Sequence, residues 1–446
     1  MPDTMSSAAQ AANLRRSLTL RDLVLYGIII IQPTAPMPVF GVVSQTARGH
    51  VVTAILIAMV AMLFTAVSYG RMARVFPSAG SAYAYVSHSL HPSLGYLTGW
   101  SVALDYMINP VICTIWCSKA TQNFFPFLPF WLLAIFFASL FTLLNLRGIE
   151  TSARINMSIA IGMGLIVLAF FGFAAHFLLQ QPTLSVAALT RPFYDPASFH
   201  MSFVGSGIAI AMLTYIGFDS VSTLSEEVEN PKRNIMLATV LVCLITGVLA
   251  SLEVYIAQLI WPDYAHYPDV DTAFVYVAQR VGGNFLFILM NFCLLVATVG
   301  SGFTSQLAAA RLLLGMGREN AIPRRFFAAV DTKTRIPRNN VLFCGVLALV
   351  AALSISYAQG AELLNFGAFI AFMGVNAAAF WEYSVRRQMK SWSYRLPPIL
   401  GFLVCLFIWL QLGTTAKIAG TVWLTIGMLY GWQRGIFKRK PVQENI

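Results

Sequence analysis

Charged residues are scarce in this sequence: only 11% of the residues are Asp, Glu, Lys or Arg, whereas 58% are hydrophobic. A soluble domain carries roughly 25% charged residues, so this composition excludes a soluble protein and indicates a membrane protein with many spans. At about 20 apolar residues for each span, with short loops, the 446 residues hold around a dozen helices.

Motifs of several other functional classes are missing as well. The six cysteines form no C-x-x-C pair, so we expect neither a metal nor redox chemistry. The six histidines are dispersed, which argues against an enzyme, and no G-x-x-x-x-G-K-[ST] phosphate loop provides an ATP site. The first nineteen residues are polar, so we expect no cleaved signal peptide. We expect no cofactor.

Twelve apolar runs predict an all-α protein with twelve transmembrane helices. They lie near residues 20–46, 52–70, 92–117, 127–146, 156–179, 201–225, 235–260, 283–310, 339–357, 361–382, 396–413 and 418–433. With the N-terminus inside, 24 of the 29 Lys and Arg residues fall in inner loops and tails. The positive-inside rule therefore predicts cytoplasmic termini and a place in the cytoplasmic membrane. This distribution accounts for the net charge of +11 without a nucleic-acid partner.

The first predicted span interrupts its own backbone. Four isoleucines, 28–31, are followed by Gln32-Pro33-Thr34-Ala35-Pro36-Met37-Pro38. Three prolines remove three backbone donors and cannot sit in one unbroken helix. Within a bilayer, the freed carbonyls are tolerated only where they face protein or a watery cavity, so the break indicates a binding site rather than a simple kink.

A second break is expected in the sixth span, where small and hydroxyl residues lead into Gly217-Phe218-Asp219. Spans one and six are five apart, which predicts two inverted five-helix repeats, spans 1–5 and 6–10, with two additional helices. The expected organisation is a tail over 1–19, a transporter core over 20–385, spans 11 and 12 over 386–433, and a tail over 434–446.

Polar side chains at depth supply the candidate site. Asp105 and Asp219 are the acids available within the membrane, where a carboxylate is costly and functional by default. Either acid could instead bond to backbone or hydroxyl groups. By contrast, Glu253, Glu362 and Glu382 fall near span ends, where headgroup water can solvate them.

Further candidates surround these acids. Amide donors and free carbonyls at two helix breaks can together hold a zwitterionic amino acid, whereas an amine needs only the acceptors and an added acid. Aromatic rings can cover the ligand, and hydroxyls on the eighth span can bind a coupling ion, although both sets also suit plain packing. The expected substrate-binding residues are Gln32, Pro33, Thr34, Ala35, Pro36, Asp105, Tyr106, Thr214, Tyr215, Phe218 and Asp219, and the expected coupling-ion residues are Thr304 and Ser305.

A set of motifs occurs in order along the chain: residues 76–85, 95–100, 217–219, 225–227, 230–233, 316–320 and Pro323. Together these motifs resemble those of the amino acid–polyamine–organocation (APC) transporters. Within the family, Ser68-Tyr69-Gly70, Asp105-Tyr106 and Asn365-Phe366-Gly367-Ala368 resemble bacterial putrescine importers. The resemblance implies the five-plus-five inverted-repeat (LeuT-like) fold, substrate held between spans one, three, six and eight, and commonly proton-coupled uptake.

Two features depart from that pattern. The putrescine branch implies an acid near Pro38, which is absent here and shifts the expectation toward an amino acid or a monoamine. The lysine that some relatives carry in span five is also missing, so the coupling mechanism cannot be transferred. We expect a proton-coupled importer of an amino acid or small amine, working as a monomer or weak dimer in the lipid bilayer. An exchanger of the same family, a channel or a non-transporting sensor are the alternatives.

Overall fold

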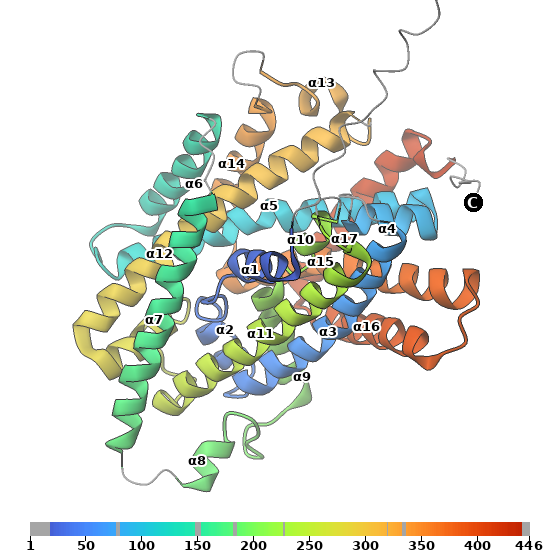
Figure 1. Ribbon diagram of the computed structural model, residues 1–446. Coiled ribbons are helices and arrows are strands. Elements are labelled where there is room, and N and C mark those ends of the chain that lie inside the picture. Colours follow the sequence, from blue (N-terminus) through green and yellow to red (C-terminus); the bar gives the residue numbers. More distant parts are fainter. Residues whose placement is uncertain are drawn as a thin grey trace, which may run out of the picture.

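The computed structural model describes residues 18–438, apart from 77–80, 148–152, 182–184, 226–227, 319 and 332–335. Residues 1–17 and 439–446 of the predicted tails, and the motif residues at 77–80, 226–227 and 319, lie outside the described residues. The described chain is helical, and its one β-type pairing is an isolated bridge between Leu18 and Val228 (Figure 1).

Seventeen α-helices are described. They are α1 (Leu20–Ile31), α2 (Phe40–Thr46), α3 (Val51–Val75), α4 (Ser81–Ser89), α5 (Pro92–Gln122), α6 (Phe130–Leu146), α7 (Ala153–Leu179), α8 (Val186–Thr190), α9 (Met201–Ala211), α10 (Ser220–Thr223), α11 (Pro231–Ile260), α12 (Ala273–Arg318), α13 (Arg324–Phe327), α14 (Arg338–Ala352), α15 (Tyr357–Phe380), α16 (Trp392–Gln411) and α17 (Thr414–Gln433). Short 3₁₀ turns η1 (Met212–Tyr215) and η3 (Ile436–Lys438) and the π-helical turn η2 (Trp381–Arg386) complete the set.

A helix or a pair of short helices occupies each of the twelve predicted ranges. Within the described residues, seven segments are long and apolar enough to cross a membrane, namely α3, α7 from Met157, Met201–Ser222, α11, α12, α15 with η2, and α16. The shorter α6 and α14 are apolar too. The chain is therefore an all-helical multi-pass membrane protein, while the total of twelve spans stays a prediction.

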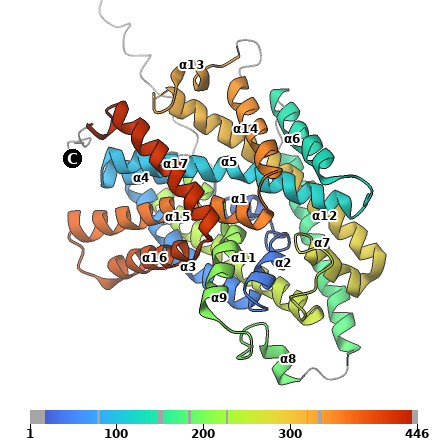
Figure 2. The same cartoon turned by 180° about the vertical axis from the view of Figure 1, so that it is seen from behind.

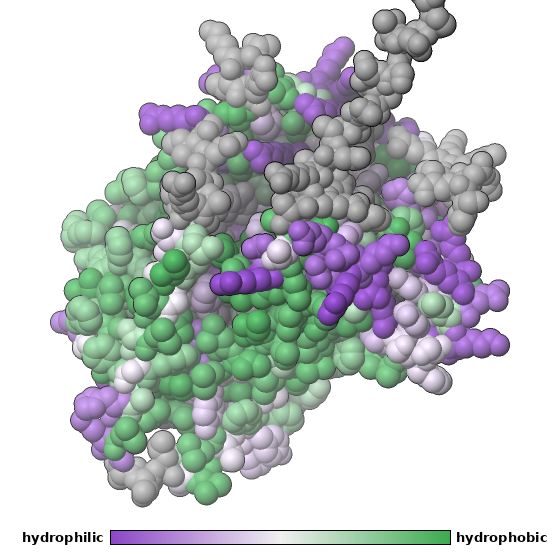
Figure 3. Space-filling view, in the orientation of Figure 1, coloured by the Kyte–Doolittle hydropathy of each residue, from purple (hydrophilic) through white to green (hydrophobic). Residues whose placement is uncertain are grey.

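The outer surface is built for lipid. Large apolar side chains face outward on α7 and α14, for example Leu165 (62% exposed), Leu168 (66%) and Val346 (63%). Figure 3 shows apolar side chains over most of the left and lower parts of the visible face, with hydrophilic residues mainly in its upper part and on its right side. Because a soluble protein rarely exposes so broad an apolar surface, these helices face the bilayer.

Close helix packing surrounds the first broken helix. In Figure 1, α1 lies at the centre of the bundle in front of α5, and Figure 2 shows α5 crossing the middle from the other side. Helix α3 runs along α11, where a Cβ atom on Gly70 would lie 2.5 Å from the Cα of Met236. Only glycine allows the two backbones to approach so closely.

The last helix is tied to α5 by a reciprocal tryptophan pair. The indole N–H of Trp100 donates to the carbonyl of Trp423 at 2.8 Å, and the indole N–H of Trp423 donates to the carbonyl of Trp100 at 2.9 Å. The two rings stack with centroids 4.7 Å apart. The indole N–H and the backbone carbonyl of each tryptophan therefore have hydrogen-bond partners in this apolar setting.

Two acids depart from expectation. Glu253 of α11 was expected near headgroup water, but its side chain is 0% exposed and neither carboxyl oxygen has a hydrogen-bond partner. The prediction was wrong because Glu253 lies on the inward face of α11, whereas Val248 and Leu252 of the same helix face outward. Glu382 is also buried, at 2% exposed, but it pairs with Arg386 and Arg387.

Candidate functional site

The first helix breaks between Ile31 and Phe40. Pro33 has no N–H to donate to the carbonyl of Ile29, so α1 ends with an acceptor that has lost its helical partner. Gln32 closes the helix with a φ of 72°, a conformation that side chains other than glycine rarely adopt. The break predicted from the three prolines is present.

The linker between the half-helices offers few donors. Ala35 donates its N–H to the carbonyl of Gln32 at 3.1 Å, and Met37 donates to the carbonyl of Thr34 at 3.0 Å. Because Pro33, Pro36 and Pro38 have no N–H, Thr34 keeps the one amide donor of residues 33–38 that lies outside these bonds. Residues 33–38 are therefore poor in donors, and further N–H groups come only from Val39 and the start of α2.

The second broken helix meets the first at a glycine. α9 ends at Ala211, η1 follows, and α10 begins only at Ser220. Gly217 lies between them with a φ of +113°, and a Cβ atom there would lie 2.9 Å from Cγ2 of Ile30. This position requires glycine for both its backbone conformation and its closeness to α1.

A cavity of about 550 Å³ lies at these breaks. Its walls come from α1, α5, α7, the α9–α10 segment, α12 and α15. Seven of the predicted residues line it: Gln32, Ala35, Asp105, Tyr106, Asp219, Thr304 and Ser305. None of the described residues that line it is Lys, Arg or His.

The two acids share this space. Asp105 is 7% exposed, and its carboxyl group lies within electrostatic range of Asp219. The backbone N–H groups of Gly217 and Ser220 lie beside the Asp219 carboxyl group. Two acids in one cavity without a basic side chain can attract positive charge. No group of three or more His, Cys, Asp or Glu residues in the described part of the chain could hold a metal ion.

The polar residues of α1 and α12 have partners within the protein. Gln32 donates its side-chain N–H to the carbonyl of Ala297 at 3.4 Å and so joins the first break to α12. The hydroxyls of Thr304 and Ser305 donate to the carbonyls of Gly300 and Ser301 in the preceding turn. Their oxygens keep lone pairs that face the cavity, so the ion-binding role stays a prediction.

Six other predicted residues do not line the cavity: Pro33, Thr34, Pro36, Thr214, Tyr215 and Phe218. Tyr215 turns into the core and donates its hydroxyl to the carbonyl of Ile55 at 2.9 Å. Phe218 is fully buried against Tyr69, with ring centroids 5.4 Å apart, and so does not close over the cavity here as expected. Rings beside a helix break can pack outward or inward, and the sequence alone does not distinguish the two.

Several lining residues were missed. Asn109 of α5 and Tyr26 of α1 both line the cavity, together with Tyr357 of α15. Asn109 is four residues after Asp105, so helical spacing could have placed it on the same face. Tyr357 offered no such signal, because it reaches the site from a helix more than 200 residues along the chain.

Comparison with known proteins identifies the chain. A family model described as amino acid permease matches residues 39–433. The chain belongs to the amino acid permease family. This permease is 30% identical over 435 residues to the low-affinity putrescine importer PlaP of Escherichia coli, covering 96% of each chain. It is 26% identical to the branched-chain amino acid permease BcaP of Lactococcus lactis, covering 95% of each chain, and 26% identical to the methylthioribose transporter of Bacillus subtilis, covering 96% of this chain and 95% of the relative.

These matches confirm the predicted resemblance to APC transporters and to putrescine importers. The permease is a membrane transporter rather than an enzyme, as expected, and a transporter of this family acts on a small-molecule substrate.

Proposed function

We propose that this permease is a secondary active transporter that imports a small aliphatic amine across the cytoplasmic membrane. The observation that carries the proposal is the pair of carboxyl groups, Asp105 and Asp219, in a cavity whose described lining contains no basic side chain. A bound ammonium group offsets the cost of holding carboxylates away from water. The free carbonyl of Ile29 adds an acceptor for the same charge.

The shortage of donors at the first break favours an amine over an amino acid. A substrate carboxylate needs several N–H groups at a helix N-terminus. Three prolines and two internal hydrogen bonds leave residues 33–38 with the N–H of Thr34 alone. A zwitterionic amino acid is therefore the second candidate, supported by the similarity to a branched-chain amino acid permease.

Two acids suit a substrate with two ammonium groups. The resemblance to putrescine importers implied an acid near Pro38, which this chain lacks. Asp105 and Asp219 provide two carboxyl groups in the cavity without that acid. A diamine can place one ammonium at each acid, while its methylene chain contacts apolar lining such as Ile30 and Met163. The similarity to a putrescine importer supports this substrate class.

The mechanism we propose is alternating access around the two broken helices in a five-plus-five inverted repeat with two additional helices. A hydrogen-bonded group supports closure of the outer end: Ser44 donates to the side chain of Gln258 at 2.6 Å, and Tyr267 donates to Ser44 at 3.0 Å. These bonds join α2 to α11 and to the following loop, so they must break for the outer end to open. Protons are the proposed driving ion.

Uptake into proteoliposomes tests the proposal. The purified chain should take up labelled putrescine faster than labelled leucine, and an inward proton gradient should increase the rate. Faster leucine uptake would overturn the amine assignment, and unchanged uptake without a gradient would overturn proton coupling. Uptake only into vesicles preloaded with amine would identify an exchanger, and binding without any flux would identify a sensor.

A further inference from the structure

A second polar site lies away from the cavity, at the corner where α3, η2 and α16 meet. Arg71, near the end of α3, is only 8% exposed. One of its terminal nitrogens, Nη2, donates to the carbonyl of Ser393 at 2.6 Å, and its guanidinium carbon lies 4.8 Å above the ring of Tyr394. Its guanidinium group is therefore fixed against the first turn of α16.

Aromatic stacking holds this corner together. The rings of Tyr383 and Tyr394 stack with centroids 5.2 Å apart and planes 11° apart. The hydroxyl of Tyr383 donates to the backbone carbonyl of Arg71 at 3.0 Å. These contacts connect η2, α16 and α3.

Positive charge at this corner is not neutralised by the described residues. The other terminal nitrogen of Arg71, Nη1, is buried without a hydrogen-bond partner, and so is Nε of Arg74. These two arginines are three residues apart and share one face of α3. The one buried acid of η2, Glu382, already pairs with Arg387 at 2.8 Å and Arg386 at 3.4 Å. Buried cationic donors without partners are costly unless an anion joins them.

The start of α16 adds to this positive potential. α16 has 20 residues, and the side chain of its N-cap residue Ser391 bonds to the hydroxyl of Ser393 at 3.0 Å but caps none of the backbone N–H groups of the first turn. The first N–H groups of a helix lack partners within it and carry the positive end of the helix dipole. A phosphate group is the anion that such a helix end and arginine forks bind best.

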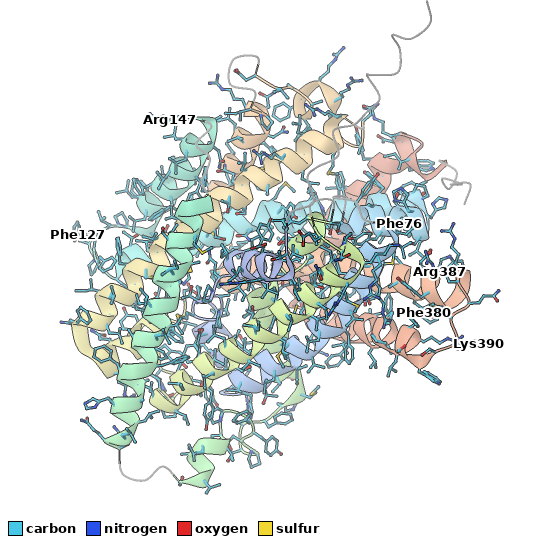
Figure 4. The ribbon with its side chains drawn as sticks, in the orientation of Figure 1. Phe76, Phe127, Arg147, Phe380, Arg387 and Lys390 are labelled. Atoms are coloured by element: carbon cyan, nitrogen blue, oxygen red, sulfur yellow. The ribbon has the colours of Figure 1, made fainter. Side chains whose placement is uncertain are left out.

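The surroundings indicate a lipid as the source of that phosphate. Trp392 is 71% exposed, Trp381 is 47% exposed and Leu396 is 46% exposed around the same corner. Exposed tryptophans collect at the boundary between membrane and water. Figure 4 places Arg387 and Lys390 at the outer edge of the molecule beside this corner, and Figure 3 shows hydrophilic residues there. A ligand here meets basic groups and lipid-facing apolar groups together.

We propose that this corner is a binding site for the phosphate group of an anionic phospholipid. Arg71 Nη1 and Arg74 Nε, which are covered here, become accessible when the overlying side chains shift, and then donate to the phosphate oxygens near the N-terminus of α16. The acyl chains lie along Trp392 and Leu396. The site joins α3, which packs on α11, to α15 and α16. Bound lipid therefore stabilises the contact between these helices.

Thermal unfolding of the purified full-length protein in neutral detergent tests this site. Phosphatidylglycerol should raise the melting temperature at lower concentration than phosphatidylcholine does. Arg74→Gln removes one donor without touching the Arg71–Ser393 bond. It should raise the phosphatidylglycerol concentration needed for half of the stabilisation (the midpoint) about tenfold, as expected for the loss of one charge-assisted hydrogen bond. Arg71→Lys, which keeps the charge but loses the fork, should raise the midpoint similarly.

Arg386→Gln is the matched control. It removes a positive charge from the same corner, but that charge is already paired with Glu382. It should change the midpoint less than about threefold, as expected for an exposed charge. Equal effects of the two lipids, or an unchanged midpoint in Arg74→Gln, would overturn the proposal. Equal stabilisation by inorganic phosphate would show that free phosphate, not lipid, is the ligand. If Arg71→Lys does not fold, Arg74→Gln decides the matter.

Discussion

Gly217 and Ile30 bring the two interrupted helices together: a Cβ atom on the glycine would lie 2.9 Å from Cγ2 of the isoleucine. The pair lies at the wall of the cavity, which both residues line. Any side chain at position 217 therefore disturbs the backbone of the second broken helix and displaces the end of α1.

The first prediction concerns this pair. Gly217→Ala should lower the free energy of unfolding by about 1–3 kcal/mol, because a φ of +113° is unfavourable for alanine and its methyl group contacts Ile30. Adding Ile30→Ala should restore only part of the loss, since the backbone strain remains. Thermal unfolding of the single and double variants measures both effects, and full restoration by Ile30→Ala would show that contact alone matters.

The second prediction concerns charge in the cavity. Asp219→Asn and Asp105→Asn should each weaken amine binding about tenfold or more, because each removes a carboxylate that faces the ammonium group. Equilibrium binding of labelled putrescine to purified protein checks this. Asp263→Asn is the control, because that acid lies in an exposed loop. Unchanged affinity in the Asp219 variant would remove it from the site.

The third prediction separates stability from transport at the first break. Pro33→Ala supplies an N–H that reaches the carbonyl of Ile29 and continues α1 once Gln32 changes from its φ of 72° to a helical conformation. The free energy of unfolding should then rise by about 1 kcal/mol, while uptake falls because the free acceptor is lost. Melting temperature and proteoliposome uptake of the same preparation provide the comparison. Normal uptake in a stabilised variant would contradict a role for the Ile29 carbonyl.

The fourth prediction concerns Glu253, whose two carboxyl oxygens lack partners. Replacing it with leucine, which has a similar volume, should raise the free energy of unfolding by about 1–3 kcal/mol, because an unsatisfied buried polar group disappears. Glu253→Gln keeps a polar group and should leave stability nearly unchanged. A lower melting temperature in Glu253→Leu would show that the acid has a stabilising partner under the conditions measured.

The fifth prediction concerns pH and the loop between α11 and α12. Burial, together with nearby Asp269, raises the pKa of Asp271 from 3.8 to about 6, while Lys119 opposes this shift. Between these two values the folded protein holds a proton that the unfolded chain has released. Stability should therefore fall as pH rises from about 4 to about 6, by at most about 3 kcal/mol. Melting temperature between pH 4.5 and 7 measures the slope, which Asp271→Asn should reduce.

The sequence predicts the helices well because lipid imposes a simple rule on them. Apolar length alone located all twelve helical ranges, and the prolines at 33, 36 and 38 located the first break. The eighth predicted span starts where the chain bends. Gly283, whose φ of 59° is not helical, separates the longer helix of that span from a preceding helical segment that begins at Ala273, and no predicted span covers that preceding segment.

Side-chain direction was harder to predict than backbone course. Helical spacing places Asn109 beside Asp105, yet nothing local shows that Phe218 packs against Tyr69 while Gly217 faces Ile30. The burial of Glu253 depends on how α11 contacts its neighbours, which no single helix encodes. The acids were found because carboxylates are rare at membrane depth, whereas Tyr357 belongs to an aromatic class too common in this chain to stand out.

The reciprocal hydrogen bonds of Trp100 and Trp423 carry a consequence for measuring motion in this protein. α17 cannot slide or rotate against α5 without losing both bonds at once, so these two helices are expected to move as one unit. A fluorophore attached near residue 433 would thus follow α5, and energy transfer from it to a dye on α1 would report displacement of α1 relative to α5.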